Sequence, residues 1–180
     1  MSIKNIPNQH VSLMKEMNSG GFFRGYASIF NHLDHQGDRV LKGAFKDSLY
    51  SWQKKREFPK MLWQHDPTKP IGQWLKIEED QKGLYVEGSI LLDLQLGREA
   101  YALIKAGVVD RLSIGYRVKQ AKTNKAGERE LLKLDLQEIS LVTFAANNAA
   151  CVLKQEMEYC TSSQQKILQA LQHAKKIITR

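Results

Sequence analysis

Short stretches in which apolar and polar residues alternate recur along this chain, and they predict β-strands rich in β-branched and aromatic residues. The predicted strands come in neighbouring pairs joined by turns and do not alternate regularly with helices. We therefore expect an α+β fold: a mostly antiparallel β-barrel of about seven strands, with helices packed outside it. The predicted strands cover residues 11–17, 22–30, 60–65, 71–78, 84–91, 111–118 and 130–144.

Three further stretches repeat their apolar residues at the spacing of an amphipathic helix. They cover residues 43–55, 94–105 and 156–178. Gly107 is placed to end the second helix, and the polar stretch 119–129 is predicted to be a loop. We expect the barrel domain to span residues 1–153. The amphipathic helix within 154–180 either packs on the barrel or serves contacts with a second copy of the chain or another partner.

The 180 residues suit one domain, and their 42% hydrophobic and 26% charged content is ordinary for a soluble globular protein. No apolar run approaches the length of about 18 residues that a membrane span needs, and residues 1–11 lack the apolar segment of a signal peptide. Two cysteines, Cys151 and Cys160, are too few for a disulfide framework. We expect a cytosolic protein with free thiols and no membrane contact.

The formal net charge of +8 permits contact with nucleic acid or with an acidic protein. The basic residues are dispersed, however, and the sequence contains no nucleic-acid-binding module. Nucleic-acid binding is therefore unsupported, and an acidic protein partner or substrate is an equally good account of the charge.

The polar stretch 31–38 places two histidines and two aspartates close together. His32 and His35 are spaced to align metal ligands only on a helix, whereas Asp34 and the glycine that follows favour a loop. Turn formation is the preferred interpretation. A metal-dependent hydrolase that uses His32, Asp34, His35 and Asp38 is kept as an alternative.

Two residues on the predicted strands carry reactive groups. Ser113 lies on the face of its strand opposite the apolar one, and Gly115 after it leaves the serine open to approach. By itself this pattern is typical of a solvent-facing serine. His65 ends an apolar strand, where we expect it to be half exposed and able to exchange protons near neutral pH.

Glu138 is the third notable residue. By alternation it shares a face with leucines 132, 134 and 136, so we expect that face to be buried. A buried carboxylate is costly unless it is hydrogen-bonded or paired. A histidine imidazole and an arginine such as Arg111 or Arg117 are equally good partners by spacing alone.

Together, Ser113, His65 and Glu138 have the chemistry of a nucleophile, a general base and an orienting acid. Ser113 and Glu138 are separated by a loop and two strand segments, so adjacent strands could bring them together. The chain order of the three residues differs from the common serine hydrolases, and the Gly-x-Ser-x-Gly elbow is absent. The pattern alone leaves catalysis open.

Eight short motifs follow one another between residues 22 and 150. They are Phe23-Arg24-Gly25-Tyr26-Ala27, Asp34 with Gly37-Asp38, Gly43-Ala44-Phe45, Leu62-Trp63-Gln64-His65-Asp66, Pro70-Ile71-Gly72, Gly83-Leu84, Leu112-Ser113-Ile114-Gly115-Tyr116 and Glu138-Ile139-Ser140-Leu141-Val142-Thr143. In this order they resemble the prohead (capsid maturation) proteases of tailed bacteriophages. That family is distantly similar to the herpesvirus capsid-maturation protease, assemblin, whose fold is a β-barrel ringed by helices.

The resemblance implies a serine endopeptidase without a cofactor. It would act inside the immature capsid, in the host cytoplasm, and cleave the scaffold protein or the scaffolding segment of the capsid protein, and commonly itself. The family's nucleophile corresponds to Ser113 and its histidine to His65. The third member corresponds to Glu138, although assemblin uses a second histidine there.

One departure from the family pattern follows the last strand. Members often read Phe-Pro-Ala-Asn-Pro, whereas this chain has the sequence Phe144-Ala145-Ala146-Asn147-Asn148. A non-catalytic capsid-assembly or scaffold-binding protein with a degenerate protease fold remains the alternative function.

Overall fold

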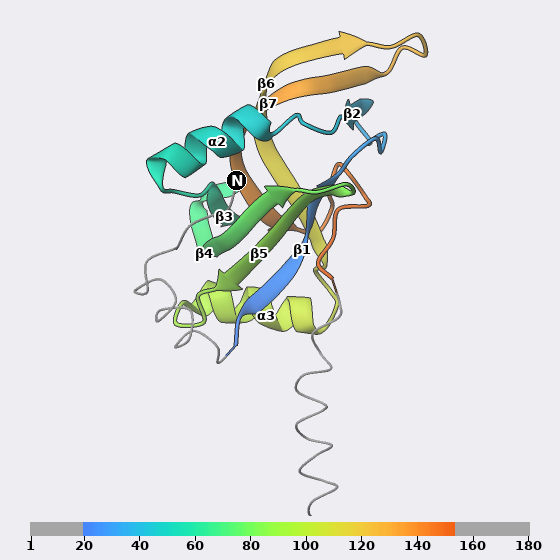
Figure 1. Ribbon diagram of the computed structural model, residues 1–180. Helices are drawn as coiled ribbons and strands as arrows, with labels where there is room; N and C mark the ends of the chain where they lie inside the picture. Colours follow the sequence, from blue (N-terminus) through green and yellow to red (C-terminus); the bar gives the residue numbers. More distant parts are fainter. Residues whose placement is uncertain (1–19, 154–180) are drawn as a thin grey trace, which may run out of the picture.

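The computed structural model describes residues 20–153, which form one curled sheet with two helices (Figure 1). The strand predicted at 11–17, the helix predicted at 156–178 and Cys160 lie outside the described residues. No helix among the described residues is long and apolar enough to cross a membrane. The elements are β1 (Phe22–Ile29), β2 (Asp38–Val40), α2 (Lys46–Lys55), β3 (Lys60–Trp63), β4 (Asp66–Glu79), β5 (Gly83–Ile90), α3 (Gln95–Lys105), β6 (Arg111–Thr123) and β7 (Arg129–Val142).

The sheet is mixed, so the expectation of a mostly antiparallel barrel is wrong. Its strand order is β1-β5-β4-β3-β7-β2, and β6 pairs with β7. β2 and β3 both run parallel to β7, whereas the remaining pairs are antiparallel. Parallel neighbours require a long connection, and here β4, β5, α3 and β6 all lie between β3 and β7 in the chain. Local strand pairing in the sequence could not reveal this contact.

The sheet also stays open instead of closing into a barrel. The residues after β7 lie between β1 and the start of β6, linked by the single bridges Gly25–Val152 and Arg111–Cys151. A Cβ on Gly25 would overlap the carbonyl oxygen of Cys151, so glycine is needed for this close approach. The thiol of Cys151 is free, as expected. The observed shape is a curled half-barrel.

The two described helices match the predicted ones. α2 begins three residues after the predicted start, and its Trp52 donates from Nε1 to Leu136 O at 2.9 Å. Ser48 of the same helix is buried and accepts the Leu136 N–H at 2.9 Å. α3 ends at Lys105, and Gly107 has a φ of 69° just beyond it. These contacts fasten α2 to the middle of β7.

The prediction of a loop at 119–129 is wrong. Most of this stretch extends β6 and β7 into a long hairpin that projects from the sheet (Figure 1). The turn is short, and Asn124 Oδ1 accepts the N–H groups of Ala126 and Glu128. Lys122 pairs with Glu130 across the strands at 3.0 Å. Opposite charges that face each other across two exposed strands stabilise the pair, so a polar stretch is compatible with a strand.

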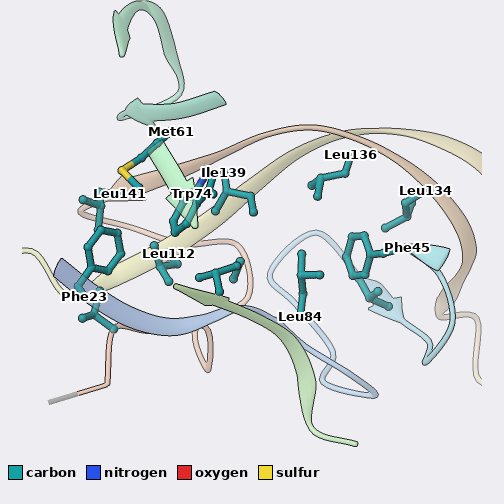
Figure 2. Close-up of a cluster of buried hydrophobic side chains, with 14 of the residues drawn as sticks. Phe23, Phe45, Met61, Trp74, Leu84, Leu112, Leu134, Leu136, Ile139 and Leu141 are labelled. Carbon is teal, nitrogen blue, oxygen red and sulfur yellow. The ribbon is translucent and has the colours of Figure 1, made fainter. Parts of the chain in front are cut away.

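The hydrophobic core lies inside the curl of the sheet. In Figure 2, Phe45 lies beside Leu134 and Leu136, whereas Trp74 and Met61 lie toward Ile139 and Leu141. The rings of Phe23 and Trp74 meet edge to face, with centroids 5.6 Å apart. β7 therefore supplies core residues along most of its length and forms a rigid support for the polar residues on its other face.

Candidate active site

His65 lies in the tight turn between β3 and β4. Gln64 and His65 have positive φ values of 55° and 59°, as the central residues of a type I′ hairpin turn do. This backbone costs a residue with a side chain roughly 1 kcal/mol. Bonds to β7 and beyond offset the cost: Gln64 N–H donates to Leu141 O at 2.9 Å, and Gln64 Nε2 to Thr143 Oγ1 at 2.9 Å. The turn holds the imidazole at the strand exit, 42% exposed, as predicted.

The imidazole of His65 contacts the carboxylate of Glu138. Nδ1 lies 2.6 Å from Oε1, and the Glu138 side chain is only 14% exposed. An ionised carboxylate only accepts hydrogen bonds, so Nδ1 carries the proton and Nε2 is left to act on another group. From the sequence, either an imidazole or an arginine could pair with Glu138, and in the structure the partner is the imidazole of His65. Arg117 is exposed, and Arg111 donates to Asn148 O at 2.6 Å.

Glu138 does not share a face with Leu134 and Leu136, although strict alternation along the sequence predicts that it does. Leu134 and Leu136 are buried in the core, but so are Ile139 and Leu141. Between Leu136 and Ile139 the core-facing positions of β7 therefore change from even to odd numbers. This change moves Glu138 to the opposite face from the one predicted.

A β-bulge causes the change of face. Gly115 of β6 pairs with Glu138, but the next residue, Tyr116, pairs with Leu136. Gln137 is thus an extra residue on β7, and such a residue reverses the alternation after it. The bulge places the carboxylate of Glu138 beside the site instead of inside the core.

Ser113 faces the same side of the sheet as this carboxylate. It pairs directly with Ser140 of β7, so the two side chains share a face. Ser113 is 9% exposed, which differs from the open, solvent-facing position expected from its strand. It is nevertheless reachable, because it lines a cavity together with His65.

This cavity has a volume of about 420 Å³ and lies between β6 and two loops. One loop contains residues 31–38, and the other follows β7 and begins at Phe144, which is 90% exposed. His32 Nε2 lies 2.6 Å from Asn148 Oδ1 and ties the two loops together. The lining includes Ala27, Ser28, His32, Asp34, His35, Gln36, Asp38, Val40, His65, Ser113, Ile114, Tyr116, Phe144, Ala145, Ala146 and Asn147.

The loop at 31–38 uses its acidic residues for structure. Asp34 Oδ1 accepts the N–H groups of Gln36 and Asp38, both at 2.8 Å, which is the turn chemistry expected there. Asp38 starts the short strand β2 and accepts two hydrogen bonds from Arg129, each 2.5 Å. Among residues 20–153, no group of three or more histidine, cysteine, aspartate or glutamate side chains is arranged to hold a metal ion.

Tyr116 completes the wall of the cavity. Its hydroxyl donates to Asp38 Oδ2 at 3.4 Å. Burial, followed by the negative charges of Asp38 and Asp34, raises the pKa of Tyr116 to about 12. The phenol therefore stays neutral and serves as a hydrogen-bond donor at this end of the cavity.

For two residues of the site, Ser140 and Gly115, the relationship to Glu138 was not predicted from the sequence. Ser140 Oγ donates to Glu138 Oε2 at 2.5 Å, and Gly115 lies opposite Glu138 in the pairing of β6 with β7. Both stand two positions from a candidate residue, in Ser113-x-Gly115 and Glu138-x-Ser140. The two patterns could have been recognised as facing strands only with the register known.

The half-barrel and its serine, histidine and glutamate are what a serine peptidase of the capsid-maturation type is expected to contain. The chain matches the model of the Caudovirus prohead serine protease family over residues 9–164, and it belongs to that family. The prohead protease of Enterobacteria phage HK97 is 35% identical over 133 residues, which are 72% of this chain and 58% of that protein. This chain therefore spans less than two thirds of that relative's length. The resemblance seen in the motifs is confirmed.

Solved structures confirm the assemblin-like fold. The capsid assembly protease of bacteriophage T4 superposes with a TM-score of 0.56 and 11% identity, covering 67% of this chain and 80% of that one. The KSHV protease, solved with a hexapeptide phosphonate inhibitor, gives a TM-score of 0.50 and 14% identity, covering 86% of this chain and 76% of that one. At these identities the similarity establishes the fold alone.

Proposed function

We propose that this chain is a serine endopeptidase of prohead maturation, with Ser113 as nucleophile, His65 as general base and Glu138 as the acid that orients His65. One observation carries the proposal: His65 Nδ1 contacts Glu138 Oε1 at 2.6 Å, at the edge of the cavity that Ser113 lines. This pairing is the arrangement that activates a serine hydroxyl. The family to which the chain belongs supports the same reading.

The reaction is acyl transfer to Ser113. His65 Nε2 takes the hydroxyl proton as Ser113 Oγ attacks the carbonyl carbon of the scissile peptide bond. The tetrahedral intermediate collapses when the imidazolium gives its proton to the departing amine, which leaves an acyl-enzyme. Water, deprotonated by His65, then attacks the acyl carbon, and the imidazolium returns the proton to Ser113 Oγ as the acid product leaves. Throughout, the Glu138 carboxylate accepts the hydrogen bond from Nδ1–H of His65 and stabilises the imidazolium.

The substrates we propose are the scaffold protein, or the scaffolding segment of the capsid protein, and the chain itself, cleaved inside the prohead in the host cytoplasm. The relative from phage HK97 is named a prohead protease, and the T4 neighbour a capsid assembly protease. The net charge of +8 suits contact with acidic protein segments. No cofactor takes part in the proposed steps.

Cleavage of the scaffold by the full-length chain tests this function. Ser113→Ala removes the nucleophile and should lower kcat by at least roughly 1000-fold with the fold intact. Ser89→Ala is the matched control, because Ser89 is 3% exposed and lies on β5, outside the cavity lining. Normal processing by the Ser113→Ala chain would refute the proposal. Binding of scaffold without cleavage by the wild type would favour the alternative, a non-catalytic assembly protein.

A further inference from the structure

We propose that Gly115 and Ser140 are positioning residues that hold the carboxylate of Glu138 against His65. The proposal rests on the proposed function, since it assigns these two residues to the same site. Each of them controls one oxygen of the carboxylate: Ser140 binds Oε2, and Gly115 leaves the space that Oε1 occupies.

Ser140 holds the second oxygen of the carboxylate. Its hydroxyl donates to Glu138 Oε2 at 2.5 Å, and it accepts the backbone N–H of His65 at 3.3 Å. Ser140 is fully buried, so water does not replace it in either bond. One hydroxyl group therefore links the acid to the backbone of the residue that the acid orients.

Gly115 provides the space for the first oxygen. It pairs with Glu138 across β6 and β7, and the carboxylate lies over its α-carbon. A Cβ at position 115 would overlap Glu138 Oε1 and lie 3.0 Å from both Cγ and Cδ. Oε1 is the oxygen that contacts His65, so an added methyl group acts directly on that contact.

The register of β6 and β7 makes the four residues one unit. Ser113 pairs with Ser140, and Gly115 pairs with Glu138, immediately before the bulge at Gln137. β6 therefore contains both Ser113 and the glycine that leaves room for the Glu138 carboxylate. β7 contains both Glu138 and Ser140, which binds that carboxylate.

This arrangement predicts an effect on turnover and not on substrate binding. Neither Gly115 nor Ser140 is among the residues that line the cavity. Without the hydrogen bond to Oε2, the Glu138 carboxylate can move and contacts Nδ1 of His65 for a smaller fraction of the time. Misplacement of a group by about 1 Å in an active site costs up to roughly 100-fold in rate. We therefore expect a lower kcat with a nearly unchanged KM.

The test uses the full-length chain with Ser140→Ala, Ser140→Thr and Gly115→Ala. Cleavage of a scaffold peptide gives kcat and KM, and the deshielded ¹H NMR signal of the His65 Nδ1 proton, assigned by its loss in Glu138→Gln, reports the contact itself. Ser140→Ala and Gly115→Ala should lower kcat by roughly 10- to 100-fold and shift or remove the signal. Ser140→Thr keeps the hydroxyl and should restore both.

Two control variants separate positioning from loss of stability. Ser48→Ala also removes a buried hydroxyl that accepts a β7 N–H, that of Leu136, whereas the hydroxyl of Ser140 donates to the Glu138 carboxylate itself. Gly88→Ala also adds a crowded methyl group to a strand, 2.8 Å from Trp74 in the core. Both should lower the free energy of unfolding and leave kcat and the NMR signal unchanged.

The NMR signal keeps this inference separate from the proposed function. If the wild type cleaves no peptide but the signal depends on Ser140 and Gly115, the proposed function fails and the positioning roles stand. If the signal and kcat are the same in both variants as in the wild type, or if the wild type gives no signal, the positioning proposal is overturned. Should Gly115→Ala fail to fold, the pair Ser140→Ala and Ser140→Thr decides alone.

Discussion

His65 and Glu138 meet across a sequence separation of 73 positions because β3 runs parallel to β7. Trp63 at the end of β3 pairs with Leu141, and the turn that follows brings the imidazole back to Glu138. The acid is mostly buried, whereas the histidine is half exposed at the cavity. An acid shielded from water acts strongly on the imidazole beside it, and the exposed side of that imidazole stays available to a substrate.

Replacing this acid by its amide should remove most of the activity. In Glu138→Gln the shape is kept, but the charge that fixes the Nδ1 proton and stabilises the imidazolium is lost. We expect kcat to fall by roughly 1000- to 10000-fold, measured with a scaffold peptide. Glu78→Gln is the control, because Glu78 is 48% exposed and pairs with Lys76 on β4; it should change kcat less than about twofold. Equal activities of the two variants would contradict the role given to Glu138.

Local sequence patterns predicted the elements that depend on neighbouring residues. The helices at α2 and α3 and the strands β1, β3, β5 and β7 follow from spacing that is visible within a single stretch. The parallel contact of β3 with β7 was not predictable in this way, because it depends on the path of the chain between them. The closed, mostly antiparallel barrel was an extrapolation from neighbouring pairs.

The candidate site shows the same limit. Ser113, His65 and Glu138 were identifiable by residue type and by the family motifs. The face on which Glu138 lies was not, since one extra residue, Gln137, reverses the alternation that the prediction assumed. A bulge leaves little local trace in a sequence. Without the bulge and the strand register, the function of Ser140 could not be inferred.

The ion pair of the buried Asp38 with the half-exposed Arg129 should matter for stability. Asp38 is 1% exposed and binds Arg129 through both carboxylate oxygens, whereas Arg129 itself is half exposed. Arg129→Met leaves a buried carboxylate without its cation, so we expect a clear fall in the free energy of unfolding. Lys122→Met on the same hairpin breaks an ion pair whose lysine is 59% exposed and should cost less than about 1 kcal/mol. Urea unfolding measures both, and equal losses would show that the burial of Asp38 is unimportant.

Tyr116 should make stability fall at alkaline pH. Its pKa is raised from 10.0 to about 12, first by burial and then by the charges of Asp38 and Asp34. A raised pKa favours the neutral phenol in the folded state, so this contribution is complete below about pH 10 and is lost as the pH rises toward 12. Tyr116→Phe should therefore lose less stability than the wild type over that range, measured by denaturant unfolding at several pH values.

An exposed tyrosine provides the control for this pH dependence. Tyr50 is 57% exposed on α2, and Tyr50→Phe removes a hydroxyl of the same kind away from the cavity. Its unfolding should follow the wild type across the alkaline range. If Tyr116→Phe and the wild type lost stability in parallel, the environment of the Tyr116 phenol would not be the cause.

Phe144 should contribute to substrate binding more than to folding. Its side chain is 90% exposed at the edge of the cavity that Ser113 lines, so the folded chain gains little from it. An aromatic group on the wall of the same cavity as Ser113 offers apolar contact to a peptide, and its loss should raise KM by roughly tenfold with kcat unchanged. Phe144→Ala should leave the free energy of unfolding within about 0.5 kcal/mol of the wild type.

Phe58→Ala is the control, because it removes another exposed ring, 42% exposed and outside the cavity lining, and should leave KM unchanged. A KM that is the same in Phe144→Ala and in the wild type would exclude Phe144 from the substrate contact.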